Sequence, residues 1–304
     1  MIRLVKNIPH YIRRVPAKVR LANQCLLGPY FKAIPPGHFY SPLPDLQEIK
    51  NRSKKIYPPK PETLGGIELR KDSQRELLQK FQRYYSDLPF HRASNPQSRY
   101  VQSKQAFPFQ DAFVLYAMIR EFRPQRIVEI GSGSSSCVML DSCDRLGLNT
   151  KLTFIEPYPE FLLSQVRPTD ATRFELRKQI VQDVPLEVFS ELQPGDILFI
   201  DSSHVSKAGS DLNFLFFDVL PILNQGVVVH FHDIFYPFEY AMKRLLEGVF
   251  WNEAYLLRAF LMFNQTFKIL MFNDYLNGTL GDYLAKEFPL CFRDQGASLW
   301  LHRL

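Results

Sequence analysis

The stretch VEIGSGSSSCVML, residues 128–140, decides the fold class of this chain. An apolar run ends at Ile130, a turn follows at Gly131-Ser132-Gly133, and a run of serines then opens a segment with helical spacing. Glycine permits positive φ and lets a ligand approach the backbone closely, and the N–H groups at the start of a helix can bind an acidic group. The same pattern also suits a tight strand–helix turn without a ligand, so both interpretations stay open on this motif alone.

Apolar runs of strand character alternate with helical segments around this stretch. We predict strands at residues 126–131, 151–157, 177–184, 196–203, 226–234, 267–273 and 297–303. We predict helical segments at residues 73–88, 107–122, 134–146, 159–166, 186–192, 211–223 and 238–264. Continuous apolar strands separated by helices are typical of a parallel sheet that is covered on both faces. The sequence therefore predicts an α/β fold with a doubly wound, mostly parallel sheet.

The beginning of the chain differs from the remainder in composition. Residues 1–65 hold 10 of the 22 prolines, and proline breaks both helices and sheet ladders. Residues 1–60 carry 12 Lys and Arg against only two acidic residues, so the basic character of the chain belongs to this segment. We predict a basic, proline-rich arm that is either a solvated tail or a peripheral contact with an anionic surface. A basic groove for nucleic acid is not expected across the remainder.

A single catalytic domain is predicted after the arm, at residues 66–304. It consists of a helical lead-in at 66–125, a sheet core at 126–304 and a helical insertion at 236–264. An aromatic segment of the arm, residues 35–46, is expected to pack against this domain. Within it, His38 and Tyr40 are lesser candidates for contact with a substrate.

The cysteines and the N-terminus indicate the compartment. The cysteines show no CxxC spacing and suggest neither a disulfide framework nor a zinc cluster; they are Cys25, Cys137, Cys143 and Cys291. The basic start lacks the apolar core of a signal peptide, and no apolar run is long enough to cross a bilayer. We therefore expect a cytoplasmic protein in a reducing environment.

Acidic residues follow two of the predicted strands. Glu156 ends the second strand, where an acidic residue in an open α/β sheet typically binds the hydroxyls of a ligand ribose. Asp183 follows the third strand and is a candidate for contact with a purine ring, although a solvated strand end is the favoured explanation for this residue by itself. A dinucleotide site requires a third glycine, and Ser136 occupies that position. A nucleoside without phosphates is therefore favoured over NAD, and a hydride-transfer enzyme is disfavoured.

The segments VEIGSGSSS, FIEPYP, VQDV, DILFIDSSH and GVVVHFHDI resemble the successive motifs of class I S-adenosylmethionine-dependent methyltransferases over residues 105–304. The pairing of FIDSSH with HFHD is similar to the branch that includes macrocin-type sugar O-methyltransferases. The resemblance implies a seven-stranded sheet whose last strand is antiparallel. It also implies a cofactor site for S-adenosylmethionine; its residues would be Glu129, Gly131, Ser132, Gly133, Glu156, Asp183 and Asp201.

Candidate catalytic residues follow the fourth and fifth strands. Asp201 closes the fourth strand, and His204 comes three residues later. In catechol-type members of the class, a lysine at this spacing is the general base, and histidine near its ordinary pKa suits proton abstraction at neutral pH. The resemblance therefore suggests His204 as the base and Asp201 as the residue that positions the acceptor.

The same resemblance suggests a divalent metal bound by Asp201, His232 and Asp233. A histidine ligand favours manganese, iron or zinc over magnesium. Strand alternation places His232 and Asp233 on opposite faces unless the strand ends at His232. The alternative is that Asp201 orients the substrate while His230 and His232 form hydrogen bonds in the cleft wall.

These observations favour a methyltransferase that acts on a nucleophilic oxygen of a small molecule or sugar. The alternative is a non-catalytic S-adenosylmethionine-binding protein that assembles with a partner through its basic arm. Asp201 and His204 favour the enzyme, because a binding module needs no charged cluster at its strand ends.

Overall fold

The structure is a computed structural model that describes residues 33–90, 98–102 and 107–304. Much of the predicted arm, with Cys25, lies outside the described residues. The chain divides into two compact units. Among the described residues, the smaller unit contains residues 33–59 together with Ala241–Phe250, and the larger unit contains those of Lys60–Tyr240 together with Trp251–Leu304.

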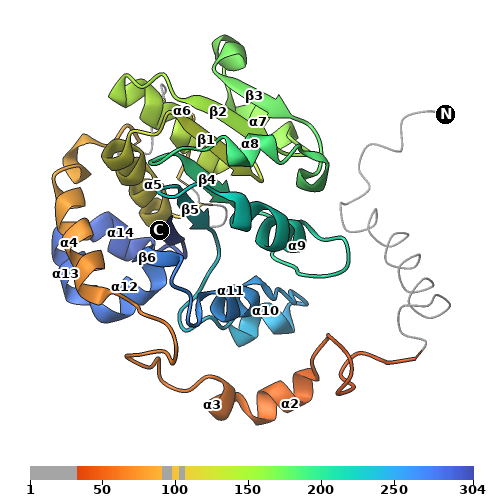
Figure 1. Cartoon of the computed structure of the whole chain (residues 1–304). Helices are drawn as coiled ribbons and strands as arrows, with labels where there is room; N and C mark the ends of the chain where they lie inside the picture. Colours follow the sequence, from red (N-terminus) through yellow and green to blue (C-terminus); the bar gives the residue numbers. More distant parts are fainter. Residues whose placement is uncertain (1–32, 91–97, 103–106) are drawn as a thin grey trace, which may run out of the picture. The chain divides into compact units, whose positions relative to one another are not determined.

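The larger unit contains a seven-stranded sheet in the order β3-β2-β1-β4-β5-β7-β6 (Figure 1). Its strands are β1 Arg126–Ile130, β2 Lys151–Ile155, β3 Phe174–Arg177, β4 Ile197–Ile200, β5 Val228–Phe231, β6 Phe267–Phe272 and β7 Leu299–Arg303. Strands β1 to β5 are parallel, and β7 is antiparallel to both of its neighbours. This arrangement confirms the predicted α/β fold, including the reversed last strand.

The third strand lies earlier in the chain than the sequence indicates, and the prediction of a strand at 177–184 was wrong. β3 pairs with β2 from Leu152 opposite Phe174 to Ile155 opposite Arg177. It stops there because β2 ends at Ile155, and residues 181–183 form a 3₁₀ turn instead. As an edge strand, β3 keeps its side chains exposed or half-exposed, so it lacks the apolar run that reveals the central strands.

Helices cover both faces of the sheet. Every residue of the central strands β4 and β5 is therefore buried. The helices of the larger unit are α4 Lys71–Gln82, α5 Phe109–Phe122, α6 Ser134–Leu146, α7 Glu160–Gln165, α8 Glu187–Ser190, α9 Asp211–Phe214, α11 Glu253–Leu261, α12 Asn273–Thr279, α13 Gly281–Glu287 and α14 Pro289–Arg293. α9 continues into a π-helical turn, Leu215–Val219. α5 packs against α6 and α14, and α4 packs against β6.

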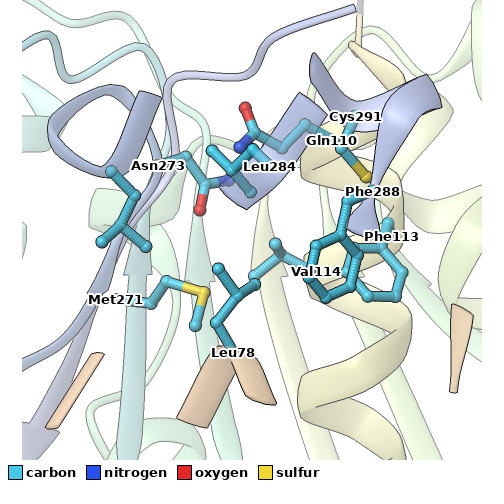
Figure 2. A pocket seen from close by; sticks show the side chains of 10 residues that line it. Leu78, Gln110, Phe113, Val114, Met271, Asn273, Leu284, Phe288 and Cys291 are labelled. Carbon is cyan, nitrogen blue, oxygen red and sulfur yellow. The ribbon is translucent and has the colours of Figure 1, made fainter. Parts of the chain in front are cut away.

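The core between α5 and β6 is tightly packed. A cavity of about 10 Å³ lies there. Figure 2 shows the amides of Gln110 and Asn273 among the apolar side chains that line it. This space holds about one water molecule, so it is not a ligand site. Gln110 also exchanges two hydrogen bonds with Asn277, at 2.8 and 3.0 Å, which ties α5 to α12.

A buried ion cluster fixes residues 98–102 to the sheet unit. The guanidinium of Arg99 lies 2.8 Å from Asp141, 2.8 Å from Asp144 and 2.6 Å from Asp170. Asp141 and Asp144 belong to α6, and Asp170 belongs to the 3₁₀ turn before β3. One arginine therefore joins three segments that are distant in the sequence.

The smaller unit contains α2 Leu46–Asn51, α3 Ser53–Ile56 and α10 Met242–Leu246. Asp45 caps α2 and accepts the backbone N–H of Gln47 at 2.7 Å. In the preceding turn, the ring of His38 stacks on Phe39 with the centroids 4.4 Å apart. The packing of residues 35–46 against the catalytic domain stays a prediction.

The helical insertion contains the helices α10 and α11, and Gly248, with a φ of +83°, follows α10 and interrupts the segment before α11 begins. None of the helices in the described ranges combines the length and apolar character needed to cross a bilayer.

Candidate functional site

The turn after β1 brings two strand ends into contact. Gly131 has a φ of +83°, and a Cβ atom at this position would lie 1.8 Å from the backbone oxygen of Asp201. The N–H of Asp201 in turn donates a hydrogen bond to the carbonyl of Ile130, at 2.9 Å. Gly131 is therefore required by the backbone itself, because both its conformation and its space exclude a side chain.

Gly133 has a different role from Gly131. Its φ of −179° is open to any residue, and a Cβ atom there would meet nothing closer than Phe161, at 3.7 Å. Its N–H donates a hydrogen bond to the hydroxyl of Ser136, which stabilises the start of α6. The fold therefore tolerates a methyl group at this position.

Glu129 lies buried below the turn and does not line the cavity above it. The hydroxyls of Ser135 and Ser136 donate hydrogen bonds to its carboxyl group. Burial raises the pKa of Glu129 to about 8, although the two serine hydrogen bonds oppose this shift. Its side chain thus joins β1 to α6 from beneath.

A cavity of about 210 Å³ opens at the carboxyl end of β1. Its lining is formed by Phe107, Gly131, Ser132, Gly133, Ser134, Ser135, Glu156, Phe161 and Asp201. Five of the predicted cofactor residues therefore come together, and Glu129 and Asp183 are not among the lining residues. Asp183 is exposed in the 3₁₀ turn after β3. Phe107 and Phe161 could not be predicted as lining residues, because an aromatic residue in a helical segment is usually a core residue.

Two polar groups of this cavity fit a nucleoside ligand. The Oγ atom of Ser132 is buried and has no hydrogen-bond partner among the described residues. Glu156 is half-buried, and its Oε1 atom accepts the backbone N–H of Tyr158 at 2.7 Å. This bond orients the carboxylate at the end of β2, where a ribose hydroxyl can donate to it.

A chain of five acidic and histidine side chains adjoins the cavity. Oδ1 of Asp201 lies 3.4 Å from Nε2 of His204 and 3.5 Å from Nδ1 of His232. The other ring nitrogens contact two further carboxylates: Nδ1 of His204 lies 2.6 Å from Oε2 of Glu253, and Nε2 of His232 lies 3.2 Å from Oδ2 of Asp111. We call these residues the acid–histidine chain. Asp201 is its central member and also lines the cavity.

The carboxylates keep both histidines of the chain protonated. Burial lowers the pKa of His204, but hydrogen bonds to Asp201 and Glu253 and the charges of both groups raise it to about 10. Burial likewise opposes protonation of His232, but the charge of Asp201 and the hydrogen bond to Asp111 raise its pKa well above the ordinary value. The pKa of Asp201 is lowered by the same two histidines against the effect of its burial.

His230 lies apart from the acid–histidine chain, inside the sheet. Its ring stacks on Phe199 with the centroids 3.7 Å apart, and its Nε2 atom lies 2.9 Å from the hydroxyl of Ser298. Burial holds its pKa well below the ordinary value, so it is neutral. His230 is therefore part of the packed core rather than of the cleft.

The predicted metal ligands Asp201, His232 and Asp233 come close together. β5 ends at Phe231, so strand alternation does not separate His232 from Asp233, and Nδ1 of His232 lies 4.0 Å from the Asp233 carboxylate. However, both ring nitrogens of His232 already face carboxylates of the acid–histidine chain. No group of three or more metal-ligating side chains suited to an ion occurs in the part of the chain that the structure describes. The set Asp201, His232 and Asp233 stays a prediction.

Asp111 and Glu253 are the members of the acid–histidine chain that were not predicted from the sequence. Asp111 is the only acidic residue in the apolar helical stretch FPFQDAFVLYAMI, and it is fully buried in α5. A charge inside such a stretch is a signal that could have identified it. Glu253 carries no comparable signal, because the first turn of a helix commonly contains an acidic residue.

Comparison with known proteins identifies the family. A methyltransferase domain model matches residues 128–234, from β1 to the end of β5. An uncharacterized protein of Archaeoglobus fulgidus is 36% identical over 170 residues, which cover 53% of this chain and 75% of that protein. Residues 128–234 of this chain therefore belong to the methyltransferase domain family.

Two solved structures are more distant from this chain in sequence. The ligand-free structure of CmcI-N160 is 20% identical and covers 53% of this chain, with a TM-score of 0.37, and the match spans less than two thirds of that protein, 63%. The Podospora anserina methyltransferase PaMTH1, solved with S-adenosylhomocysteine, is 14% identical over 86% of this chain and 98% of its own, with a TM-score of 0.43.

Proposed function

We propose that this methyltransferase methylates a hydroxyl oxygen of a small molecule or sugar. The observation that carries the proposal is the double position of Asp201, which lines the cavity beside the glycine turn and is the central member of the acid–histidine chain. The carboxylate of Asp201 thus lies between the proposed cofactor site and His204, which can accept a proton. That juxtaposition is what transfer to a hydroxyl requires.

The residues of the cavity suit S-adenosylmethionine. Its sulfonium supplies a methyl group that is already activated. Glu156 would accept hydrogen bonds from the ribose hydroxyls, and the turn at Gly131 and Gly133 would let the ligand approach the backbone. The unpaired hydroxyl of Ser132 would gain a partner there.

His204 is the proposed general base. The acceptor O–H proton would pass to Nε2 of His204 while the oxygen forms its bond to the methyl carbon and the electrons of the methyl–sulfur bond return to sulfur. Because Asp201 and Glu253 raise the pKa of His204 to about 10, most of the enzyme carries a protonated His204 at neutral pH. The rate should therefore rise with pH towards about 10, instead of levelling off near the ordinary histidine pKa of about 6.5.

Ligand binding and turnover test the two halves of the proposal. Calorimetry should show that S-adenosylmethionine and S-adenosylhomocysteine bind and that NAD binds far more weakly. Glu156→Ala should weaken binding by about 1.5–3 kcal/mol, the contribution of charge-assisted hydrogen bonds. Preferential binding of NAD would contradict the cofactor assignment.

Turnover is measured by screening hydroxylated metabolites with a labelled methyl donor. His204→Ala should lower turnover by about 100- to 10,000-fold, leave cofactor affinity nearly unchanged and remove the rise of the rate with pH. Normal turnover in a folded variant would exclude His204 as the base. Binding without turnover of any acceptor would favour the non-catalytic alternative. The same assay in excess EDTA tests the predicted metal set, since loss of turnover that one divalent ion restores would establish a metal.

A further inference from the structure

The outer members of the acid–histidine chain, Asp111 and Glu253, come from helices, whereas its other members follow strands. Asp111 projects from α5, and Glu253 opens α11, whereas Asp201, His204 and His232 follow β4 and β5. One ring nitrogen of each histidine thus contacts a buried carboxylate on a helix. The other ring nitrogen of both histidines faces Oδ1 of Asp201. We propose that Glu253 and Asp111 are positioning residues for methyl transfer, which orient His204 and His232 and thereby hold Asp201 in place; this inference rests on the proposed function.

α11 holds both the backbone and the ring of His204. The carbonyl of His204 accepts the N–H groups of Asn252 at 3.0 Å and of Glu253 at 3.2 Å. Its φ of +59° is unusual for a residue other than glycine, so surrounding contacts must maintain it. On its other side, the ring of Trp251 lies 4.3 Å from the imidazole, centroid to centroid. The helix start therefore determines where this imidazole lies.

The carboxylate of Glu253 determines which way the imidazole of His204 points. Its Oε2 atom binds Nδ1–H at 2.6 Å, so the opposite nitrogen, Nε2, faces Asp201. The hydrogen bond at one ring nitrogen fixes the role of the other. With the ring reversed, a carbon atom instead of a nitrogen would face Asp201, and proton transfer through that edge would stop.

Asp111 holds the second histidine in the same manner. Its carboxylate accepts hydrogen bonds from Asn273 at 2.7 Å and from the backbone N–H groups of Ala297 and Ser298, both at 3.0 Å. These bonds leave it no freedom to rotate. Its Oδ2 atom therefore binds Nε2 of His232 in one orientation, and Nδ1 of His232 faces Asp201.

A purely structural role explains Glu253 poorly. The side chain is buried, and its Oε1 atom has no hydrogen-bond partner among the residues that the structure describes. Burial of a polar atom without a partner destabilises the folded state. A residue retained for stability alone would be expected to have partners for both oxygens. The single strong bond of Glu253 is the one that orients His204.

Substitutions at the two ends test the proposal. Glu253→Ala and Asp111→Ala should lower kcat by about 10- to 100-fold, the usual loss when a partner that orients a functional group is removed. The KM for S-adenosylmethionine should change less than about twofold, because neither residue lines the cofactor cavity. Glu253→Gln and Asp111→Asn keep the volume and an oxygen acceptor, so they should recover part of kcat.

Asp196→Asn is the matched control. Asp196 is a buried carboxylate at the opposite end of β4, where it accepts the N–H groups of Gln125 at 2.9 Å and Arg126 at 2.8 Å. Its loss should lower stability and leave kcat unchanged. Equal losses of kcat in the control and in the chain variants would mean that stability alone explains them and would overturn the proposal.

A direct readout separates this proposal from the proposed function. In ¹⁵N-histidine-labelled protein, the proton on Nδ1 of His204 should give a slowly exchanging, downfield resonance that Glu253→Ala removes and Asp196→Asn retains. This result does not depend on knowing the acceptor. If the resonance persists in folded Glu253→Ala, or if the variant keeps normal kcat, the positioning role is wrong. If no acceptor is methylated while the resonance behaves as expected, the proposed function fails and the orientation of His204 by Glu253 stands.

Discussion

The two glycines of the turn after β1 allow ligand binding to be tested separately from folding. Gly133→Ala adds a methyl group that the fold accommodates, since its nearest neighbour would be Phe161 at 3.7 Å. The same methyl would project where the cofactor is proposed to approach the backbone. We expect S-adenosylhomocysteine affinity to fall by at least about tenfold, or about 1.4 kcal/mol, with an unchanged thermal midpoint.

Gly278→Ala in α12 is the control for this measurement, because no atom lies within 4 Å of its added Cβ. It should bind S-adenosylhomocysteine like the unmodified protein. If Gly133→Ala binds equally well, the ligand does not approach this part of the backbone.

Glu129, beside the same turn, should make the free energy of unfolding depend on pH. Its pKa of about 8 lies above the value of about 4.3 for an unfolded glutamate. Between these two values the folded protein binds one more proton than the unfolded chain, so the free energy of unfolding falls as pH rises, by up to about 1.4 kcal/mol per pH unit. Glu129→Gln stays neutral and should lose less stability than wild type from pH 5 to pH 8.

Urea unfolding of both proteins at pH 5, 6, 7 and 8 measures this difference. Parallel losses of stability would show that Glu129 is already ionised in the folded state, and the hydroxyls of Ser135 and Ser136 would then be sufficient partners for the charge.

Among the segments, residues 98–102 place one buried arginine beside three carboxylates. Arg99 is buried and neutralises Asp141 and Asp170, which are themselves buried. Arg99→Ala leaves these charges without their partner, which typically destabilises a protein by about 3–5 kcal/mol. We expect urea unfolding to show a loss of this size.

Arg173→Ala is the comparison for the same cluster. Its pair with Asp144 is partly exposed on both sides, and exposed pairs contribute about 0.2–1 kcal/mol. Similar losses in the two variants would mean that water reaches Arg99 and that its segment does not pack as described.

The strands were more predictable than the site because their signal is local. β4 and β5 are fully buried apolar runs, and each lies within its predicted range. β3 was misplaced because an edge strand with the sequence FELR has little apolar pattern. Hydrophobic periodicity in the sequence indicates which residues are buried, so it identifies a half-exposed strand poorly.

The centre of the acid–histidine chain could be predicted from strand order, and its ends could not. Asp201, His204 and His232 follow neighbouring parallel strands, whose carboxyl ends meet at one edge of the sheet. Asp111 is 121 residues away from its partner His232, and Glu253 is 49 residues away from His204. Their meeting depends on which helix face packs against the strand ends, and residue spacing carries no information about that.

At the scale of the whole molecule, charge is distributed unevenly between the beginning of the chain and the rest. Residues 1–60 contain 12 Lys and Arg and two acidic residues. Each Lys or Arg near an anionic bilayer contributes about 1 kcal/mol. If the arm contacts such a surface, the full chain should sediment with anionic vesicles at low salt and be released at high salt, and a chain that lacks residues 1–34 should sediment less.

Neutral vesicles are the control for this sedimentation, since they offer no charge for the arm. Equal sedimentation of the full and shortened chains with anionic vesicles would identify the arm as a solvated tail.

The contact between Gly131 and the Asp201 carbonyl has a mechanical consequence. The glycine belongs to the turn that lines the proposed donor site, and Asp201 belongs to the acid–histidine chain, which is proposed to face the acceptor. Their backbones are in contact, because a Cβ atom on Gly131 would lie 1.8 Å from the carbonyl oxygen of Asp201. Neither segment can shift without displacing the other. If the proposed function holds, this main-chain contact would set the separation between methyl donor and acceptor, and mutations of side chains that contact the acceptor would change which molecule binds without altering that distance.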